Sequence, residues 1–379
     1  MRSTYHRANG AQRLCALAFA LLAIAACAAP ARAASPPSGP TLVIEGAGFG
    51  HGVGMSQYGA LGFAVHGYSD TQILAHYYTG TAIGQAPAGH MVHVLVGSKV
   101  QDVPLEQYVR GVVAAEMPSS WPAAALEAQA IASRTYALTS DAGGSRFDVY
   151  SDTRSQVYKG AAAETPQSNA AVAATAGQIV TYAGQPATTY FFASSGGSTE
   201  NIEDSFIGAA SQPWLKAVSD PYETSAANWR VSMSMASAQT QLAGLVKGSL
   251  LGIEVLRRGV SPRIVSAQVL GSRGDTLVSG PELEYRFGLQ SAWAYFNVQN
   301  GTSVVREPDL SGQTPHGAPP AGAPATASTS TSTSNAKHAS AKPAASAARA
   351  PKMDAHRGGT VGPEAQEQQV GRTGGTLAG

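Results

Sequence analysis

The chain has 379 residues, a formal net charge of +1 and a charged fraction of 13%. This near-neutral balance excludes a broad basic surface of the kind that nucleic-acid binding needs, so no nucleic-acid partner is expected. Only two cysteines occur, Cys15 and Cys27. Because both lie near the N-terminus, the rest of the chain is expected to fold without disulfides or thiolate metal ligands.

The N-terminal segment has the pattern of an export signal. Arginines precede an apolar run at residues 14–26 that is too short to span a bilayer comfortably, and residues 31–33 (ARA) fit a cleavage site. Residues 1–33 are therefore predicted to be a signal peptide, with a mature chain that begins at Ala34. A competing interpretation is that residues 24–27 form a lipoprotein box with a lipid on Cys27. Both interpretations predict export to the periplasm or cell envelope.

Residues 41–306 are predicted to form the folded domain, which is large enough for one domain or two closely packed lobes. Strand-like segments surround one pair of helices without a regular βαβ alternation, which predicts an α+β fold. A helix is expected around residues 69–78. The predicted strands lie at residues 41–44, 91–96, 179–182, 188–193 and 264–270.

The first helix of the pair carries the most informative pattern of the chain. Pro104 is placed to open it and residues 117–118 (MP) to close it. Its apolar positions recur at helical spacing, and Glu116 is the next position on that face. Because loss of water favours the neutral form of a carboxyl group, Glu116 is a candidate general acid. The apolar positions are Leu105, Tyr108, Val109, Val112 and Val113.

The second helix is predicted over residues 123–138, with Ser119 or Ser120 as its cap. Its alanines allow close packing and the short connection predicts an antiparallel pair. Arg134 lies on one side of this helix together with Glu127. It could approach the Glu116 end of the first helix or form an ion pair with Glu127 or another acid.

A glycine at every second position from 46 to 54 predicts unusual backbone conformations and close approach by a ligand. The run lacks the lysine of a phosphate loop and the helix context of a dinucleotide site. His51, Ser56, Gln57 and Tyr58 follow as a polar and aromatic rim, so a ligand-facing loop is predicted. The alternative is a structural bend with Tyr58 in the core.

Beyond about residue 307 the sequence is rich in Pro, Gly, Ser, Thr and Ala and nearly lacks large apolar residues. Such a segment cannot bury enough surface to offset its ordering entropy. Residues 307–379 are therefore predicted to be a disordered, low-complexity tail, either inert or a spacer at the cell wall.

Several unusual motifs of this chain resemble the stage II sporulation protein D (SpoIID/LytB) family. They extend from residue 46 to residue 218, which is most of the predicted fold. The motifs are residues 50–60 (GHGVGMSQYGA), 108–118 (YVRGVVAAEMP), 128–137 (AQAIASRTYA), 152–153 (DT), 156–158 (QVY), 194–200 (SSGGSTE) and 214–218 (WLKAV).

The resemblance implies a lytic transglycosylase that acts on peptidoglycan glycan strands, with Glu116 as its catalytic acid. It also implies substrate-binding roles for a second group of residues. These are Arg134, Lys216, Glu223, His51, Gln57 and Tyr58. In the sporulation form the Gly-His-Gly motif comes late in the chain, whereas here it precedes the catalytic helix.

Some relatives bind zinc through Cys and His, but this chain has Ser155 and Ser194 in those neighbourhoods. His90 and His93 alone are weak evidence for a metal site. We therefore expect no metal and no cofactor.

One carboxyl group is enough for a lytic transglycosylase. It protonates the glycosidic oxygen and then accepts the proton of the C6 hydroxyl of muramic acid, which closes a 1,6-anhydro ring without water. Two other functions are compatible with the sequence. Because the family name also covers amidase enhancers, the chain could bind glycan and activate a cell-wall amidase, or it could be a plain wall-binding module.

Overall fold

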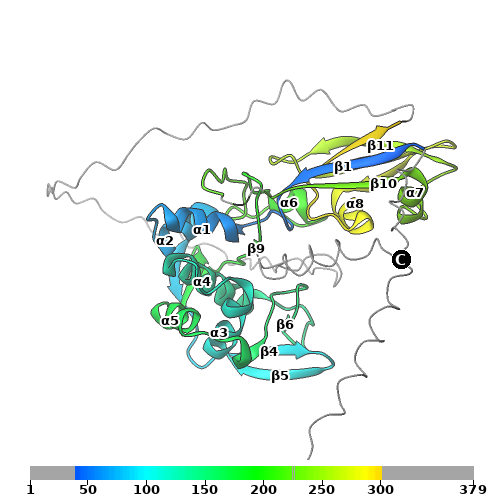
Figure 1. The fold of residues 1–379 in the computed structure, drawn as a ribbon. Coiled ribbons are helices and arrows are strands. Elements are labelled where there is room, and N and C mark those ends of the chain that lie inside the picture. Colours follow the sequence, from blue (N-terminus) through cyan, green and yellow to red (C-terminus); the bar gives the residue numbers. More distant parts are fainter. Residues whose placement is uncertain (1–38, 224, 226, 301–379) are drawn as a thin grey trace, which may run out of the picture. The chain divides into compact units, whose positions relative to one another are not determined.

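The computed structural model describes residues 39–223, 225 and 227–300 (Figure 1). The predicted signal peptide, Cys27 and the predicted tail lie outside these residues. The described chain mixes helices and strands, as the α+β prediction requires, and it contains two hydrophobic cores. In this part of the chain no helix combines the length and the apolar character needed to cross a membrane.

The first core contains the helical pair and lies on the side of the chain labelled α1–α5 in Figure 1. Its helices are α1 (Gln57–Val65), α2 (Asp70–Tyr77), α3 (Leu105–Glu116), α4 (Ala123–Thr139), the short 3-10 helix Gly160–Ala163, α5 (Pro166–Ala174) and α6 (Ile202–Ser205). Three small sheets accompany them, with strand orders β5-β4-β6, β3-β7-β8 and β2-β9. Their strands are β2 (Met55–Ser56), β3 (Ala82–Gln85), β4 (Met91–Val96), β5 (Lys99–Pro104), β6 (Val149–Tyr150), β7 (Gln178–Tyr182), β8 (Gln185–Pro186) and β9 (Phe191–Phe192).

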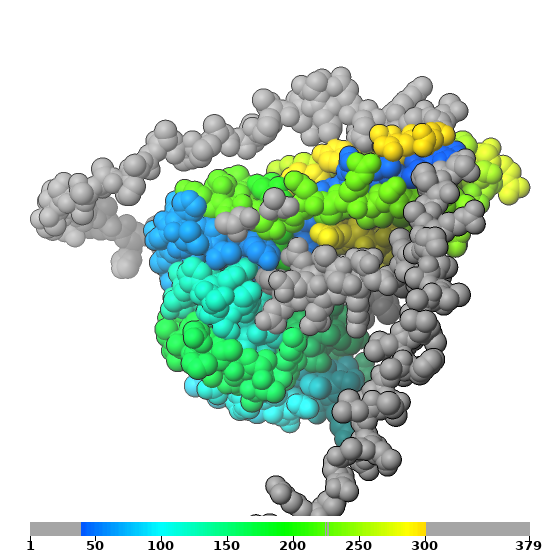
Figure 2. Space-filling view, in the orientation of Figure 1, coloured from blue at the N-terminus to red at the C-terminus, as the bar shows by residue number. Residues whose placement is uncertain are grey.

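The second core is built from two three-stranded antiparallel sheets and two helices, α7 (Met235–Gln241) and α8 (Gly280–Phe287). In the first sheet β1 lies between β10 and β14, so the beginning and the end of the described chain are paired. Figure 2 shows this as a blue strand bordered by green and yellow segments. The strands of the two sheets are β1 (Thr41–Ala47), β10 (Asn228–Ser234), β14 (Ala294–Gln299), β11 (Leu250–Arg258), β12 (Ile264–Gly271) and β13 (Thr276–Ser279).

The predicted helical pair is present as α3 and α4. Pro104 precedes α3 and Met117 follows it, as predicted. Contacts join Glu106 in the first turn of α3 to Arg134 in the last third of α4, so the two helices run antiparallel. The predicted serine cap of α4 is wrong, because that helix begins after Pro122 and no side chain caps it. Proline suits this position since it has no N–H that needs a partner.

The glycine run forms a bend that leads directly into α1. Four of its glycines have positive φ angles between 76° and 101°: Gly48, Gly50, Gly52 and Gly54. At Gly52 a Cβ atom would lie 2.6 Å from Nε of Arg263, so a larger residue would also collide. The bend runs alongside residues 194–200, with bridges from Phe49 to Ser194 and from Val53 to Glu200.

Arg263 fixes the bend to the second core. This residue is 2% exposed and precedes β12 directly. Its guanidinium donates hydrogen bonds to the carbonyl oxygens of Ser198 (3.0 Å) and Ser195 (3.2 Å). A buried arginine with several acceptors holds backbone segments firmly. The glycine run and residues 194–200 are therefore positioned by a side chain from the C-terminal half of the chain.

Candidate active site

Glu116 is the last residue of α3 and is completely buried. The apolar stripe of this helix is buried with it, which explains why the carboxyl group is carried into the interior. Burial and the negative end of the helix dipole disfavour the charged carboxylate. Hydrogen-bond donors to its oxygens favour the charged carboxylate instead, so it matters which donors reach the two oxygens.

Two N–H groups from distant parts of the sequence hold the Glu116 carboxyl group. The backbone N–H of Val157 donates to Oε1 (2.6 Å), and the side-chain amide of Gln57 donates to Oε2 (3.1 Å). Three predicted motifs, residues 50–60, 108–118 and 156–158, therefore meet at one carboxyl group. The other amide atom of Gln57, Oε1, is buried and has no hydrogen-bond partner among the described residues.

Two partly exposed aromatic residues follow the partners of Glu116 in the chain. Tyr58 follows Gln57 in the chain and Tyr158 follows Val157. The Tyr58 ring lies 5.1 Å from the ring of Trp121, centroid to centroid. Because aromatic rings offer flat apolar area with little rotamer freedom, they suit the faces of a sugar ring. Tyr58 and Trp121 are therefore candidates for a substrate surface.

Buried polar side chains support the site from behind. Gln129 on α4 donates to Oγ of Ser133 (2.9 Å), and Gln156 donates to the carbonyl oxygen of Ser133 (3.2 Å). All three residues are completely buried. Gln156 precedes Val157, so this bond helps to hold the backbone N–H that meets Glu116. Such a network fixes a functional group more firmly than separate contacts would.

His51 lies in a ring of aromatic side chains and uses both ring nitrogens in backbone contacts. The N–H of Val53 donates to Nδ1 (3.1 Å), so Nε2 carries the proton and donates to the carbonyl oxygen of Phe191 (3.1 Å). Burial, helped by the charge of Arg263, lowers the pKa of His51 to about 3. His51 is therefore a neutral residue that shapes the glycine bend. Contact with substrate stays a prediction for this residue.

Arg134 is completely buried, and its positive charge is paired within the fold. Its Nε and Nη2 atoms both donate to the carboxylate of Glu106 (2.8 Å each), and Nη1 donates to the carbonyl oxygen of Gln178 (3.0 Å). Of the two predicted arrangements, the structure shows the ion pair, with Glu106 as the partner in place of Glu127. No described hydrogen bond or ion pair joins Arg134 to Glu116.

Glu223 lies in a second cluster of carboxyl groups, next to Asp220. Its Oε2 accepts hydrogen bonds from the hydroxyl of Ser56 (2.9 Å) and from the N–H of Ser195 (2.8 Å). The hydroxyl of Ser195 also donates to Asp220 (2.9 Å). Because Ser56 and Gln57 are consecutive, the start of α1 connects this cluster to Glu116. The substrate-binding role of Glu223 stays a prediction.

Asp220 is 2% exposed. Burial, together with the charge of Glu223, raises the pKa of Asp220 from 3.8 to about 7. The folded protein therefore holds a proton that the unfolded chain releases between about pH 4 and pH 7. The stability that Asp220 contributes is present below about pH 4 and is lost as the pH rises through 7.

We expect Asp220→Asn to remove this pH dependence, since the amide stays uncharged. From pH 4 to pH 8 the free energy of unfolding of the wild type should fall relative to the variant by up to about 4 kcal/mol. Urea unfolding of both proteins across this range measures the difference. Asp275→Asn, at an exposed position, is the control variant. If the difference in the free energy of unfolding between the wild type and Asp220→Asn stayed constant from pH 4 to pH 8, the raised pKa would be refuted.

Lys216 lies apart from these contacts, on the surface. Its side chain is 39% exposed, and its ammonium group forms an ion pair with Glu203 and donates to the hydroxyl of Ser211 (2.5 Å). Substrate binding by Lys216 stays a prediction, because no described hydrogen bond joins it to Glu116.

His93 bonds to Asp148 (2.9 Å) and lies 3.8 Å from Asp102. Within residues 39–223, 225 and 227–300, no three His, Cys, Asp or Glu side chains form a group suited to a metal ion.

Sequence reasoning did not identify Asp220, Glu106 or the N–H of Val157. The first two are ordinary acids in sequence, and their roles depend on partners 20 or more residues away. The Val157 contact is made by the backbone and leaves no side-chain signal. Only the position of Val157 between two motif residues could have indicated it.

Comparison with known proteins shows what this chain is similar to. A family model described as stage II sporulation protein (SpoIID) matches residues 97–182, which include α3, α4 and Val157. Stage II sporulation protein D of Bacillus subtilis (strain 168) is 31% identical over 226 residues, and the match covers 55% of this chain and 64% of that protein. Its counterpart in Bacillus amyloliquefaciens is 28% identical over 241 residues, covering 58% and 68%. The amidase enhancer of B. subtilis is 33% identical over 141 residues, or 37% of this chain and 19% of that protein.

Proposed function

We propose that this chain, which is similar to stage II sporulation protein D over a segment that includes α3 and α4, is a lytic transglycosylase of peptidoglycan. It cleaves the bond between N-acetylmuramic acid and N-acetylglucosamine and leaves a 1,6-anhydromuramic end. The observation that carries the proposal is Glu116, a buried carboxyl group held by Gln57 and Val157 where three motifs meet.

The contacts of Glu116 suit one group that acts first as an acid and then as a base. In its neutral form the carboxyl group donates a proton to the glycosidic oxygen as positive charge develops on muramic acid. The carboxylate that results is stabilised by the two N–H donors. It then accepts the proton of the C6 hydroxyl, whose oxygen closes the anhydro ring, so the proton balance requires no water.

The neighbouring side chains complete this mechanism. Tyr58 and Trp121 provide aromatic surface for a sugar ring. Gln57 holds the Glu116 carboxyl group through its side-chain amide N–H. In this proposal Arg134 stabilises the position of α3 against α4 and does not contact the sugar, since its donors are used by Glu106 and backbone carbonyl groups.

A digestion experiment tests the activity. Purified protein is incubated with glycan strands, either intact or stripped of stem peptides, and the products are analysed by mass spectrometry. Anhydromuramic ends are expected, and comparison of the two substrates shows whether peptides must first be removed. Reducing muramic ends would indicate hydrolysis by water instead, and the absence of new ends with both substrates would contradict catalysis.

A second function, a non-catalytic enhancer of a cell-wall amidase, is favoured by a specific observation. Glu116 has no exposed surface, and one relative is named as an amidase enhancer. In this alternative the aromatic surface binds glycan and a partner amidase cleaves the stem peptide. The two functions are distinguished by the rate at which a purified amidase releases peptide, measured with and without this protein. An enhancer should raise this rate without forming new glycan ends.

A further inference from the structure

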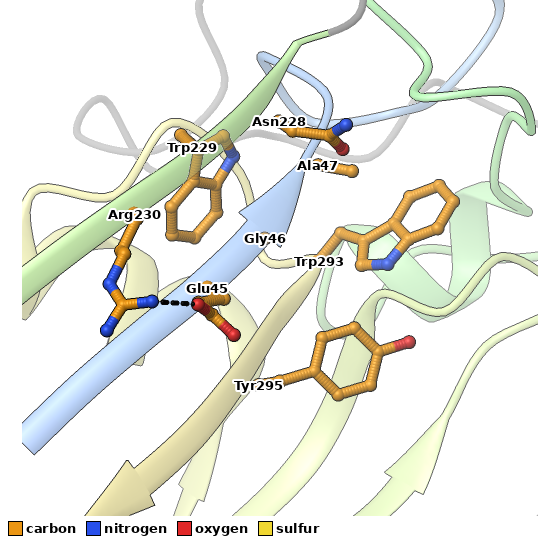
Figure 3. Close-up of a pocket in the computed structure, with 8 residues that line it drawn as sticks. All are labelled: Glu45, Gly46, Ala47, Asn228, Trp229, Arg230, Trp293 and Tyr295. Atoms are coloured by element: carbon orange, nitrogen blue, oxygen red, sulfur yellow. Dashed lines mark hydrogen bonds and ion pairs between the residues drawn. The ribbon is translucent and has the colours of Figure 1, made fainter.

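A pocket of about 530 Å³ lies at one end of the sheet formed by β10, β1 and β14, outside the segment that the family model matches (Figure 3). Its volume is within the range of small-molecule sites, roughly 300–1,000 Å³. The lining residues are Glu45, Gly46, Ala47, Asn228, Trp229, Arg230, Trp293 and Tyr295. Three of them are large aromatic residues, which surround Gly46 in Figure 3.

Each aromatic side chain is held by its surroundings. The indole N–H of Trp229 donates to the carbonyl oxygen of Gly48 (3.1 Å), and its ring lies so close to Gly46 that a Cβ there would be 2.2 Å away. The guanidinium of Arg258 lies 4.2 Å from the centre of the Tyr295 ring. Rings fixed in this way lose little entropy when a ligand binds.

Trp293 connects the pocket to the candidate active site. A Cβ atom at Gly196 would lie 3.1 Å from the Trp293 ring. Gly196 directly follows Ser195, which bonds to Glu223 and whose carbonyl oxygen is held by Arg263. The consecutive residues Ser195 and Gly196 therefore contact both the carboxyl cluster and the Trp293 ring of the pocket.

The pocket contains one positive and one negative side chain, so its charges cancel. Arg230 and Glu45 form an ion pair (2.6 Å), and both side chains are more than half exposed. Asn228 is exposed beside them. The pocket thus offers hydrogen-bond donors and acceptors with no net charge, which disfavours a polyanion or polycation and suits hydroxyl and amide groups.

We propose that this pocket is a second glycan-binding site, which takes an N-acetylglucosamine unit of the strand. The apolar faces of the sugar ring lie against Trp293 and Tyr295, and Glu45, Arg230 and Asn228 bond to its hydroxyl and acetamido groups. The choice of a glycan rests on the proposed function. The choice of N-acetylglucosamine rests on the balanced charge, since muramic acid without its stem peptide carries a carboxylate.

The test uses the full mature chain with Glu116→Gln, so that binding is measured without cleavage. The probe is chitohexaose, a chain of six N-acetylglucosamine units, titrated by calorimetry and by tryptophan fluorescence. Trp293→Ala and Tyr295→Ala in this background should each weaken binding about 10-fold. Tyr285→Ala removes an exposed aromatic side chain of α8 that does not line the pocket, and it should leave binding unchanged.

Tyr295→Ala decides the outcome if Trp293→Ala unfolds, because Tyr295 is 39% exposed and its loss should not disturb the core. Unchanged binding by folded Tyr295→Ala would overturn the proposal, as would the absence of chitohexaose binding. Loss of binding on Tyr58→Ala alone would also overturn it, by placing the sugar beside Glu116. A wild type that binds but does not cleave glycan would refute the transglycosylase and leave this site intact.

Discussion

Glu116→Gln should reduce the formation of anhydromuramic ends by at least about 10³-fold, since one group performs both proton transfers. Glutamine has nearly the same shape, and its amide oxygen can still accept the hydrogen bond from Val157. The site is expected to keep its form if the amide of Gln57 turns, so that its Oε1 accepts from the new NH2 group. What the variant loses is the ability to give and take a proton. The initial rate of new anhydro ends, counted by mass spectrometry, measures the effect.

Glu127→Gln is the matched control for this variant. Glu127 is a half-buried acid on α4, burial raises its pKa, and no hydrogen bond or ion pair among the described residues joins it to Glu116. Its variant should cleave at close to the wild-type rate. If Glu116→Gln retained a similar rate while binding glycan normally, the proton donor would have to be another group. The Asp220–Glu223 cluster, which Ser56 connects to the same helix, would then be the next candidate.

The helical pair could be predicted from sequence because its signals are local. The apolar stripe of α3 has helical spacing, and Pro104 and Pro118 lie at its two ends. The same stripe correctly predicted that Glu116 is carried into the interior. Local periodicity therefore gave both the element and the burial of its key side chain.

Helix α1 was not predicted, because the residues that allow its packing also weaken its helical signal. A Cβ at Gly59 would lie 2.2 Å from Asp220, and one at Gly62 would lie 1.7 Å from the carbonyl oxygen of Tyr222. Glycine is required at both positions, although it costs about 1 kcal/mol in a helix relative to alanine. Tertiary packing thus outweighed local propensity at the helix that supplies Gln57.

The partners of the charged residues were also beyond prediction. Arg134 could have met Glu116, Glu127 or another acid, and helical spacing alone did not distinguish them. The choice of Glu106 depends on how far α3 and α4 overlap, and on Gly177, whose N–H donates to the same carboxylate (3.1 Å). The resemblance to the family identified Arg134 as important, whereas only the structure shows an internal partner for it.

Glu106→Gln is expected to destabilise the fold by about 1–2 kcal/mol, because the fully buried Arg134 loses its opposite charge while water screens part of the interaction at Glu106, which is 43% exposed. The double variant Glu106→Gln with Arg134→Met should recover part of this loss, since it removes the unpaired charge as well. Urea unfolding of the wild type, both single variants and the double variant gives the coupling energy. Glu45→Gln, which breaks an exposed ion pair with Arg230, is the control and should cost less than about 1 kcal/mol.

The same variants separate a structural role of Arg134 from a direct role in substrate binding. If Arg134 acts through the packing of α3 on α4, Arg134→Met should lower stability, while folded protein should bind glycan with nearly unchanged affinity. The opposite result, normal stability with weakened binding, would mean that the guanidinium reaches the sugar. Since both hydrogen bonds to Glu106 would then have to break in the complex, Glu106→Gln should in that case strengthen binding. A direct role therefore changes the affinity of the two variants in opposite directions, whereas a structural role leaves both affinities nearly unchanged, and stability and affinity measured on the same samples decide between them.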